Sequence, residues 1–237
     1  MNLISLQLKT SANFSKNLSK LIKQIENAPK ESLILAPELF LTGYSYNRLE
    51  EASQITLKAL KVLKFLSHDK IISITMTTKK ENKFYNTSYT FNNGKIIHTQ
   101  SKAELFVLDD EQKYFTTGDK KDIKIFKING IKIAILICFE LRFIDLIKKV
   151  QGADIILVPA MWGKSRKNNY ETLTQAAAVI NQCYVVASNS ANDNMAKSSA
   201  IITPFGKVTK NDNKKLIMST YDNKEIKKMR KYLNTRI

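Results

Sequence analysis

Cysteine, glycine and proline are scarce in this chain of 237 residues, which has two, seven and four of them, and no long apolar run occurs. Both cysteines, Cys138 and Cys183, lie in apolar segments. A secreted disulfide framework normally has more cysteines in a smaller chain, so both thiols are expected to be reduced. The longest unbroken apolar stretch covers residues 133–139 and is far shorter than the ~18 residues that a membrane span needs.

Signals for secretion and for a division into domains are also missing. The first residues, MNLISLQLKTSANF, contain no basic leader and no cleavage site. We therefore expect a cytoplasmic protein without a membrane partner. The glycines and prolines form no linker, and no repeat or low-complexity block is present, which favours a single domain over residues 1–237.

The formal net charge of +17 raises nucleic acid or an anionic membrane as a partner. The excess is nearly all lysine, and it is scattered along the chain without arginine clusters or interleaved aromatic residues that would stack on bases. This distribution favours a lysine-rich solvated surface, so we expect no specific nucleic-acid partner. Weak nonspecific binding of anions follows in either case.

Strand-like and helix-like patterns alternate along most of the chain. Amphipathic helices are predicted over residues 11–27, 50–67, 141–152 and 168–182. Strands are predicted within residues 1–8, 32–38, 71–76, 84–100, 123–138, 153–160, 183–191, 198–208 and 215–221. Two Asn-Gly dipeptides, at 93–94 and 129–130, suit type I′ turns and predict hairpins. The alternation predicts a layered α/β protein with sheets inside and helices outside.

Three of the apolar strands end in an ionisable residue. LILAPE ends in Glu38, KIIHTQSK in Lys102 and ILIC in Cys138. In layered α/β folds, sites are built at the ends of strands and in the loops that follow them. A thiol needs a base to become a thiolate, and a carboxylate serves if hydrophobic surroundings raise its proton affinity. A neighbouring lysine stabilises a developing oxyanion and also favours the thiolate.

Each of these residues also has a purely structural interpretation. Glu38 follows Pro37 and is compatible with a cap of a loop or helix start. Lys102 is compatible with one more surface lysine, and Cys138 with a small core hydrophobe. Cys183 opens another predicted strand and is expected to be an inert core residue. The sequence around the three strand ends decides between these interpretations.

Four segments, in order, resemble the nitrilase superfamily of carbon-nitrogen hydrolases, whose members use a Glu-Lys-Cys triad. They are APELFLTGY around Glu38, SKAELF around Lys102, EQKYFTTGD around Glu111 and LICFELRF around Cys138, followed by ADIILVPAMW and INQCYVVASNSA. The resemblance covers essentially the whole chain. It implies an α-β-β-α sandwich with two central sheets and helices on both outer faces, usually paired into a homodimer through outer helices.

The resemblance implies thiol-dependent hydrolysis of a non-peptide C–N bond through a thioester intermediate. Glu38 would take the thiol proton of Cys138, and Lys102 with the backbone N–H of Phe139 would hold the oxyanion. Glu111 would orient Lys102 and the substrate, unless it is a solvated charge in its loop. The expected substrate is a small linear carboxamide, which would give an acid and ammonia, and no metal or organic cofactor is expected.

Trp162, Tyr44 and Phe139 are the candidate substrate-binding residues. Trp162 follows ADIILVPAM and resembles a family position that often lines the acyl pocket, although a lone tryptophan is equally compatible with core packing. Arg142 is expected to brace Glu140 or the start of the next helix rather than to pair with a substrate carboxylate.

Several other positions bear on the comparison with the family. His68 and His98 show no metal-ligand spacing and are expected to be structural. The family often has histidine where this chain has Glu104, and arginine and glutamate where it has Ala177 and Ile180.

An amidase is the leading hypothesis for the function. A nitrilase or an N-carbamoyl-amine hydrolase of the same family would use the same triad, so the sequence does not separate them. A catalytically silent binding or scaffold protein is the alternative from a different class. The presence of Glu38, Lys102 and Cys138 together argues against it.

Overall fold

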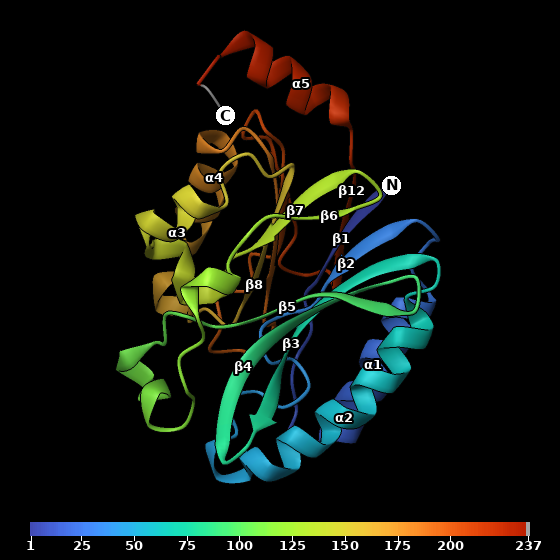
Figure 1. The fold of residues 1–237 in the computed structure, drawn as a ribbon, viewed down its shortest axis with the longest axis vertical. Helices are drawn as coiled ribbons and strands as arrows, with labels where there is room; N and C mark the ends of the chain where they lie inside the picture. Colours follow the sequence, from blue (N-terminus) through green and yellow to red (C-terminus); the bar gives the residue numbers. More distant parts are fainter. Residues whose placement is uncertain (236–237) are drawn as a thin grey trace.

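Two six-stranded sheets pack face to face in the computed structural model, which describes residues 1–235. Helices α1 (Phe14–Glu26) and α2 (Leu49–Leu66) cover the outer face of one sheet, and α3 (Ile144–Lys149) and α4 (Lys167–Ile180) cover the outer face of the other (Figure 1). These four layers form the α-β-β-α sandwich that the sequence predicts.

The first sheet, sheet A, has the strand order β12-β1-β2-β3-β4-β5. The strands β1, β2 and β3 run parallel to one another, and the other neighbours are antiparallel. The bounds are β1 (Asn2–Leu6), β2 (Ser32–Leu35), β3 (Lys70–Lys80), β4 (Lys83–Asn92), β5 (Lys95–Ser101) and β12 (Leu216–Thr220).

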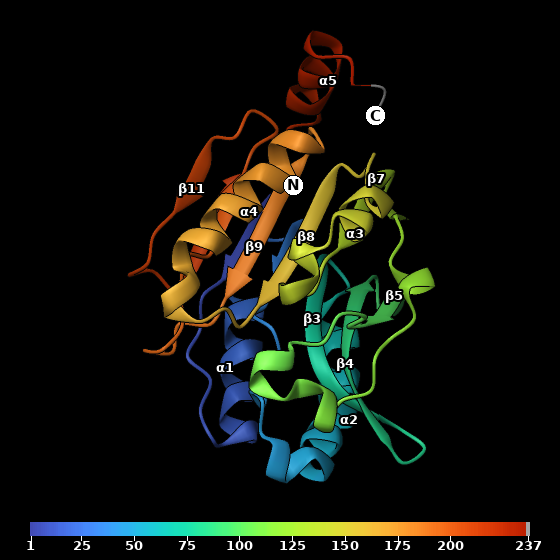
Figure 2. The same cartoon turned by 90° about the vertical axis from the view of Figure 1, so that its left-hand side faces the viewer.

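The second sheet, sheet B, repeats this arrangement with the order β11-β10-β9-β8-β7-β6. Its parallel centre is β7, β8 and β9, and Figure 2 shows α3 and α4 lying in front of these strands. The bounds are β6 (Phe126–Ile128), β7 (Ile131–Ile135), β8 (Ile155–Ala160), β9 (Tyr184–Asn189), β10 (Ala200–Ile202) and β11 (Val208–Lys210).

The parallel strands of sheet A are apolar on both faces because each face has its own core. Leu3, Leu33 and Ile71 lie in register on neighbouring strands and belong to the core shared with sheet B. The residue after each of them belongs instead to the core formed with α1 and α2. Side chains alternate between the faces of a strand, so a continuous apolar run is what burial on both faces requires.

Two serines connect the sheets by hydrogen bonds inside this core. The Ser5 hydroxyl of β1 donates to the carbonyl of Ala187 at 2.6 Å. The Ser188 hydroxyl of β9 donates to the carbonyl of Leu6 at 2.6 Å. All of these groups are buried, so each bond satisfies a polar pair that water does not reach.

Both predicted Asn-Gly hairpins are present. Asn93 and Gly94 join β4 to β5 with φ values of 49° and 73°. Asn129 and Gly130 join β6 to β7 with φ values of 50° and 80°. A type I′ turn needs positive φ at both central residues, which glycine and asparagine tolerate best.

The segment after β7 differs from the predicted helix over 141–152. It contains a 3-10 helix, η5 (Cys138–Arg142), followed by the short α3, and Gly152 ends it with a φ of 92°. Five further 3-10 helices lie in connections: η1 (Tyr46–Arg48), η2 (Val107–Asp109), η3 (Glu111–Lys113), η4 (Lys120–Asp122) and η6 (Lys164–Arg166).

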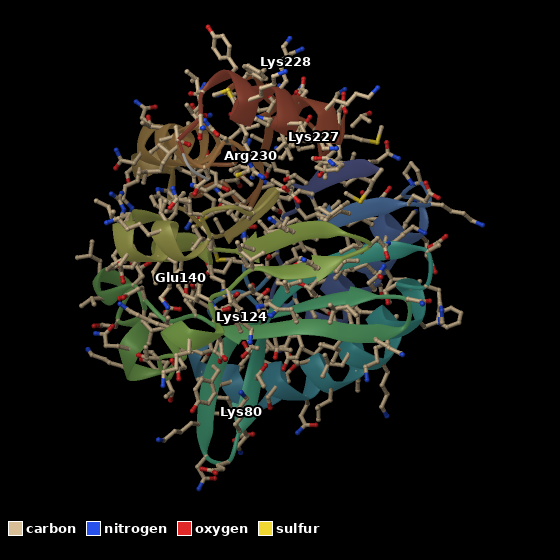
Figure 3. The ribbon with its side chains drawn as sticks, turned by 45° about the horizontal axis from the view of Figure 1, so that its top comes forward. Lys80, Lys124, Glu140, Lys227, Lys228 and Arg230 are labelled. Carbon is tan, nitrogen blue, oxygen red and sulfur yellow. The ribbon has the colours of Figure 1, made fainter. Side chains whose placement is uncertain are left out.

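The final helix, α5 (Asn223–Tyr232), is absent from the sequence-based assignment, which placed no element after residue 221. Ile226 and Met229 are buried, and Arg230 donates to the carbonyl of Ala153 at 2.6 Å. Lys227 and Lys228 lie on the same helix (Figure 3). Within residues 1–235, no helix is both long enough and apolar enough to cross a membrane.

Candidate active site

The predicted ionisable residues meet at the carboxyl ends of the strands. Glu38 follows β2, Lys102 follows β5 and Cys138 opens η5 after β7. The backbone N–H of Glu38 donates to the carbonyl of Ala160, the last residue of β8, at 3.2 Å. The ends of strands from both sheets are therefore joined at this point.

Lys102 lies between two carboxylates, and all three side chains are buried. Its ammonium donates to Oε1 of Glu38 at 2.9 Å and to Oε2 of Glu111 at 2.8 Å. It also donates to the Tyr44 hydroxyl at 3.0 Å. Burial alone would lower the pKa of Lys102, but the nearby charges outweigh burial and the pKa lies above its ordinary value, so the ammonium stays charged.

The two oxygens of Glu38 have unequal surroundings. Oε1 accepts from Lys102, from the Tyr44 hydroxyl at 2.6 Å and from Nδ2 of Asn86 at 2.9 Å. Oε2 accepts from the backbone N–H of Met161 at 3.0 Å. These donors fix the orientation of the carboxylate and leave Oε2 with the greater remaining capacity to accept a proton.

Cys138 combines a strained backbone with a buried thiol. Its φ of 49° is in the left-handed region, which costs a non-glycine residue about 1–2 kcal/mol. Burial and the charge of Glu38 raise the pKa of the thiol well above its ordinary value, although Lys102 opposes the shift. The resting group is thus a thiol, which needs a base to become a nucleophile.

Glu111 is a buried partner of Lys102 and not a solvated loop charge. Its side chain accepts from the ammonium and from the backbone N–H of Phe106 at 2.7 Å. Burial raises the pKa of Glu111, while Lys102 opposes this and Glu38 adds to it. Two carboxylates therefore share one cation in a volume that excludes water.

Glu140 is a further buried carboxylate beside this cluster. Its Oε1 accepts from the backbone N–H of Ala103 at 2.7 Å, and its Oε2 accepts from that of Ile137 at 2.7 Å. Burial raises the pKa of Glu140 to about 7, against the lowering effect of these two hydrogen bonds. Glu140 comes from η5, between β7 and α3, and is labelled in Figure 3.

A cavity of about 410 Å³, including its open mouth, lies over the cluster. Cys138, Lys102 and Glu111 line it together with all three predicted substrate-binding residues, Tyr44, Phe139 and Trp162. Further lining residues are Tyr46, Phe106, Asp109, Arg142, Met161 and Arg166. Its lining combines aromatic side chains with a few charged groups, as is typical of small-molecule sites.

Of the two structural roles expected of Arg142, that of bracing Glu140 is wrong, because both oxygens of Glu140 accept from backbone N–H groups. The Arg142 guanidinium donates to the side chain of Asn169 at 3.1 Å and lies 5.0 Å from the ring centroid of Trp162. Arg142 lines the cavity and does not contact Glu140 through a hydrogen bond.

Trp162 and Tyr44 combine cavity lining with fixed hydrogen bonds. The indole N–H of Trp162 donates to the carbonyl of Arg166 at 2.9 Å, so the ring is both packed and exposed to the cavity. The Tyr44 hydroxyl belongs to the Glu38 and Lys102 cluster rather than to the cavity rim alone.

Sequence reasoning missed Asn86, the N–H of Met161 and the two hydrogen bonds that the Glu140 carboxylate accepts. No local motif marks Asn86, which lies within β4 among other polar residues. The spacing Cys138-Phe139-Glu140 was visible, and a buried-looking carboxylate two residues after the thiol was the available signal for Glu140.

The remaining titratable candidates lie outside the cavity. His98 is buried, hydrogen-bonded to Gln100 at 3.0 Å and stacked on Phe126. His68 and Cys183 do not line the cavity, and Cys183 is fully buried. In the part of the chain that the structure describes, no three His, Cys, Asp or Glu side chains are grouped to hold a metal ion.

Comparison with known proteins agrees with this geometry. A family model described as carbon-nitrogen hydrolase matches residues 4–231. The chain is 34% identical over 206 residues to the 2-oxoglutaramate amidase of Bacillus subtilis, covering 82% of this chain and 79% of that protein. It is 30% identical over 237 residues to a probable nitrilase of Schizosaccharomyces pombe, covering 92% and 86%.

The fold also matches solved structures. A carbon-nitrogen hydrolase superfamily protein from Xanthomonas campestris superposes with a TM-score of 0.87 at 18% identity, covering 99% of this chain and 95% of that one. The layers are thus those of the nitrilase superfamily. The chain belongs to the carbon-nitrogen hydrolase family, as the segments around Glu38, Lys102 and Cys138 indicated.

Removing the shared cation tests the electrostatics of the cluster. In Lys102→Met, Glu38 and Glu111 face each other in a buried site without a cation. We expect a loss of about 3–5 kcal/mol in the free energy of unfolding at pH 8. The loss is smaller at pH 5. A carboxyl whose pKa is raised in the folded state stabilises the fold when it is protonated, and this stabilisation disappears as the pH rises. Urea unfolding at both pH values measures it.

The double variant Lys102→Met/Glu111→Gln is the matched control. It removes one of the two opposed carboxylates, so it should recover part of the stability at pH 8. Equal stability of Lys102→Met and the unmodified protein at pH 8 would contradict the shared-cation account.

Proposed function

We propose that this protein hydrolyses a small linear carboxamide to an acid and ammonia, with Cys138 as nucleophile. The observation that carries the proposal is the placement of Cys138, Lys102 and Glu111 on one cavity, with Glu38 bonded directly to Lys102. A nucleophile, a base and an oxyanion donor within one water-poor site are what acyl transfer requires.

In the acylation step, Oε2 of Glu38 accepts the thiol proton of Cys138 while sulfur attacks the amide carbon. The C–S bond forms as the carbonyl π pair moves to oxygen. Lys102 and the backbone N–H of Phe139 stabilise this oxyanion. When the C–N bond breaks, protonated Glu38 gives its proton to the leaving nitrogen. Ammonia departs, and the acyl group remains on the Cys138 sulfur as a thioester.

In the deacylation step, Glu38 takes a proton from a water molecule while the oxygen of that water attacks the thioester carbon. The C–S bond then breaks, the proton returns to sulfur, and the acid leaves. Glu111 keeps Lys102 oriented through both steps, because it holds the ammonium with both of its oxygens at 2.8 and 3.1 Å.

The substrate class follows from two arginines on the cavity wall. Arg142 lies over the ring of Trp162, and Arg166 lies 5.0 Å from the ring centroid of Phe106. Planar guanidinium groups bind carboxylates in a fork geometry. We therefore propose an amide that carries a carboxylate at its other end, as does the substrate named for the 2-oxoglutaramate amidase of Bacillus subtilis.

Cys138→Ala should abolish ammonia release across a panel of amides, because no other group can form the thioester. Circular dichroism should show an unchanged fold, since the smaller side chain still fits the buried turn. Cys183→Ala, which changes the other buried thiol, should retain activity. Ammonia release by Cys138→Ala, or an acyl adduct on Cys183 in the mass spectrum, would refute the assignment of the nucleophile.

Arg142→Ala and Arg166→Ala should each raise KM for succinamate by about 10- to 100-fold, the value of one charge-assisted hydrogen bond. KM for butyramide, a neutral amide of the same length, should not change. Lys164→Ala removes a nearby exposed charge that does not line the cavity and serves as the control. A nitrile hydrolysed faster than any amide would assign the site to nitrilase chemistry instead.

We also propose a homodimer formed through α4. The exposed end of this helix carries Val179 and Ile180, and the loop residue Phe205 and the β11 residue Val208 are further exposed apolar side chains. One methyl group of Val179 would lie 3.1 Å from a side-chain Cβ at Gly206, and Gln175 donates to the carbonyl of Gly206 at 2.9 Å, so α4 and the turn at 204–206 are in contact. Apolar faces of this kind are typical of subunit interfaces.

Ile180→Lys should shift the protein from dimer to monomer in light scattering after size exclusion, because a charge would be buried at the interface. Leu57→Lys places the same change on α2, where Leu57 is similarly exposed, and should leave the dimer intact. A monomeric unmodified protein at micromolar concentration would refute the proposal.

We also propose that the protein is cytoplasmic and has no specific nucleic-acid partner.

A further inference from the structure

Glu140 joins the chain segments that carry Lys102 and Cys138. Its Oε1 accepts from the N–H of Ala103, the residue after Lys102. Its Oε2 accepts from the N–H of Ile137, the residue before Cys138. Both bonds are 2.7 Å long and buried, and Glu140 is fully buried. One carboxylate therefore spans from the end of β5 in sheet A to the end of β7 in sheet B.

One other hydrogen bond joins these two strands, because the Gln100 side chain of β5 donates to the carbonyl of Ile135 in β7 at 3.2 Å. The N–H of Lys102 donates to the carbonyl of Asn86, which holds Lys102 to β4 within sheet A. The N–H of Leu136 donates to the carbonyl of Leu157, which holds the end of β7 to β8 within sheet B. Each segment is thus fixed to its own sheet, and Glu140 joins the two segments at the residues next to Lys102 and Cys138, beyond the bond made by Gln100.

The bond to Ile137 also acts on the strained turn at the thiol. Cys138 has a φ of 49°, and the N–H groups at the start of a helical turn have no partner within the turn. The Glu140 side chain reaches back to such an N–H, as a capping glutamate does. It therefore stabilises the turn that directs the Cys138 side chain to the cavity.

We propose that Glu140 is a positioning residue for the hydrolysis, whose carboxylate sets the separation of the Cys138 sulfur and the Lys102 ammonium by holding both of their chain segments. The proposal rests on the proposed function for its catalytic readout. Glu140 does not line the cavity, so it acts through these two residues and not by contact with substrate.

The charge state of Glu140 matters to this role. An ionised carboxylate accepts both N–H groups, whereas a protonated one turns one oxygen into a hydroxyl whose proton has to find an acceptor. Burial raises the pKa of Glu140 to about 7, and the charges acting on it are Lys102, which lowers the pKa, and Glu38, which raises it. Both hydrogen bonds to Glu140 are therefore intact above pH 7, and the pair is weakened below it.

Glu140→Gln is the principal test, because the amide has the shape of the carboxylate but only one acceptor oxygen. We expect kcat for succinamate to fall about 10- to 100-fold, as when an outer partner of a catalytic group is removed, with little change in KM. The kcat profile of the unmodified enzyme should fall as pH drops through about 7. The variant should lack this inflection and stay at the low rate at all pH values.

Alkylation of Cys138 by iodoacetamide gives a readout that needs no substrate. In Glu140→Gln the thiol should react more slowly at pH 8, because Lys102 is no longer held where it favours the thiolate. Peptide mass spectrometry separates this adduct from Cys183. If the unmodified protein hydrolyses no amide, the proposed function fails, and the alkylation rates still decide the role of Glu140.

Two further variants separate positioning from general stability. Glu140→Asp keeps both acceptor oxygens on a shorter stem, so it should recover part of kcat and the inflection near pH 7. Asp154→Asn is the matched control, since Asp154 accepts from the N–H of Lys132 at the other end of β7. It should lower the midpoint of thermal unfolding without changing the kcat profile. The proposal is overturned if Glu140→Gln keeps the unmodified kcat, pH profile and alkylation rate, or if Asp154→Asn alters them equally.

Discussion

The buried ammonium of Lys102, shared by Glu38 and Glu111, is the interaction on which the site depends. Two carboxylates and a thiol in one water-poor volume would repel one another as soon as the thiol lost its proton. A single cation in contact with both carboxylates makes this concentration of groups possible. Burial and the charge of Glu38 keep the pKa of Cys138 high even though Lys102 opposes the shift, so the resting group is a thiol.

The two sheets supply the geometry that this electrostatic arrangement needs. Each contributes strand ends to the same edge, and three residues with a left-handed backbone lie there. Positive φ values occur at Cys138, at Leu39 after Glu38 and at Asp110 before Glu111. Strained residues persist where the surrounding structure determines them strongly. The two buried cores supply that support, and the hydrogen bonds of Glu140 hold the turn at Cys138 in place.

Local patterns predicted what local physics determines. The Asn-Gly hairpins, the strands around the two cores and the ionisable residues at strand ends follow from periodicity, turn chemistry and the family segments. Asn86 was not predictable, because its partner Glu38 lies 48 positions away and β4 offers several similar polar residues. The helix α5 was missed because only Ile226 and Met229 among its ten residues are buried, which leaves a weak apolar pattern. The place of Arg142 on the cavity wall was not expected, because Glu140 two positions earlier offered a nearer partner, and that carboxylate is bonded to backbone instead.

The serine hydroxyls between the sheets have a consequence for protein engineers. Apolar contact is non-directional and would tolerate a small translation of one sheet over the other, whereas the bonds of Ser5 and Ser188 tolerate little. Redesigning this interior with larger aliphatic residues would increase the buried apolar area and remove both hydrogen bonds between the sheets. Such a variant would gain heat resistance, but the site residues of sheet A would no longer be aligned with those of sheet B. Thermostability screens on this scaffold should therefore select for turnover as well as for folding.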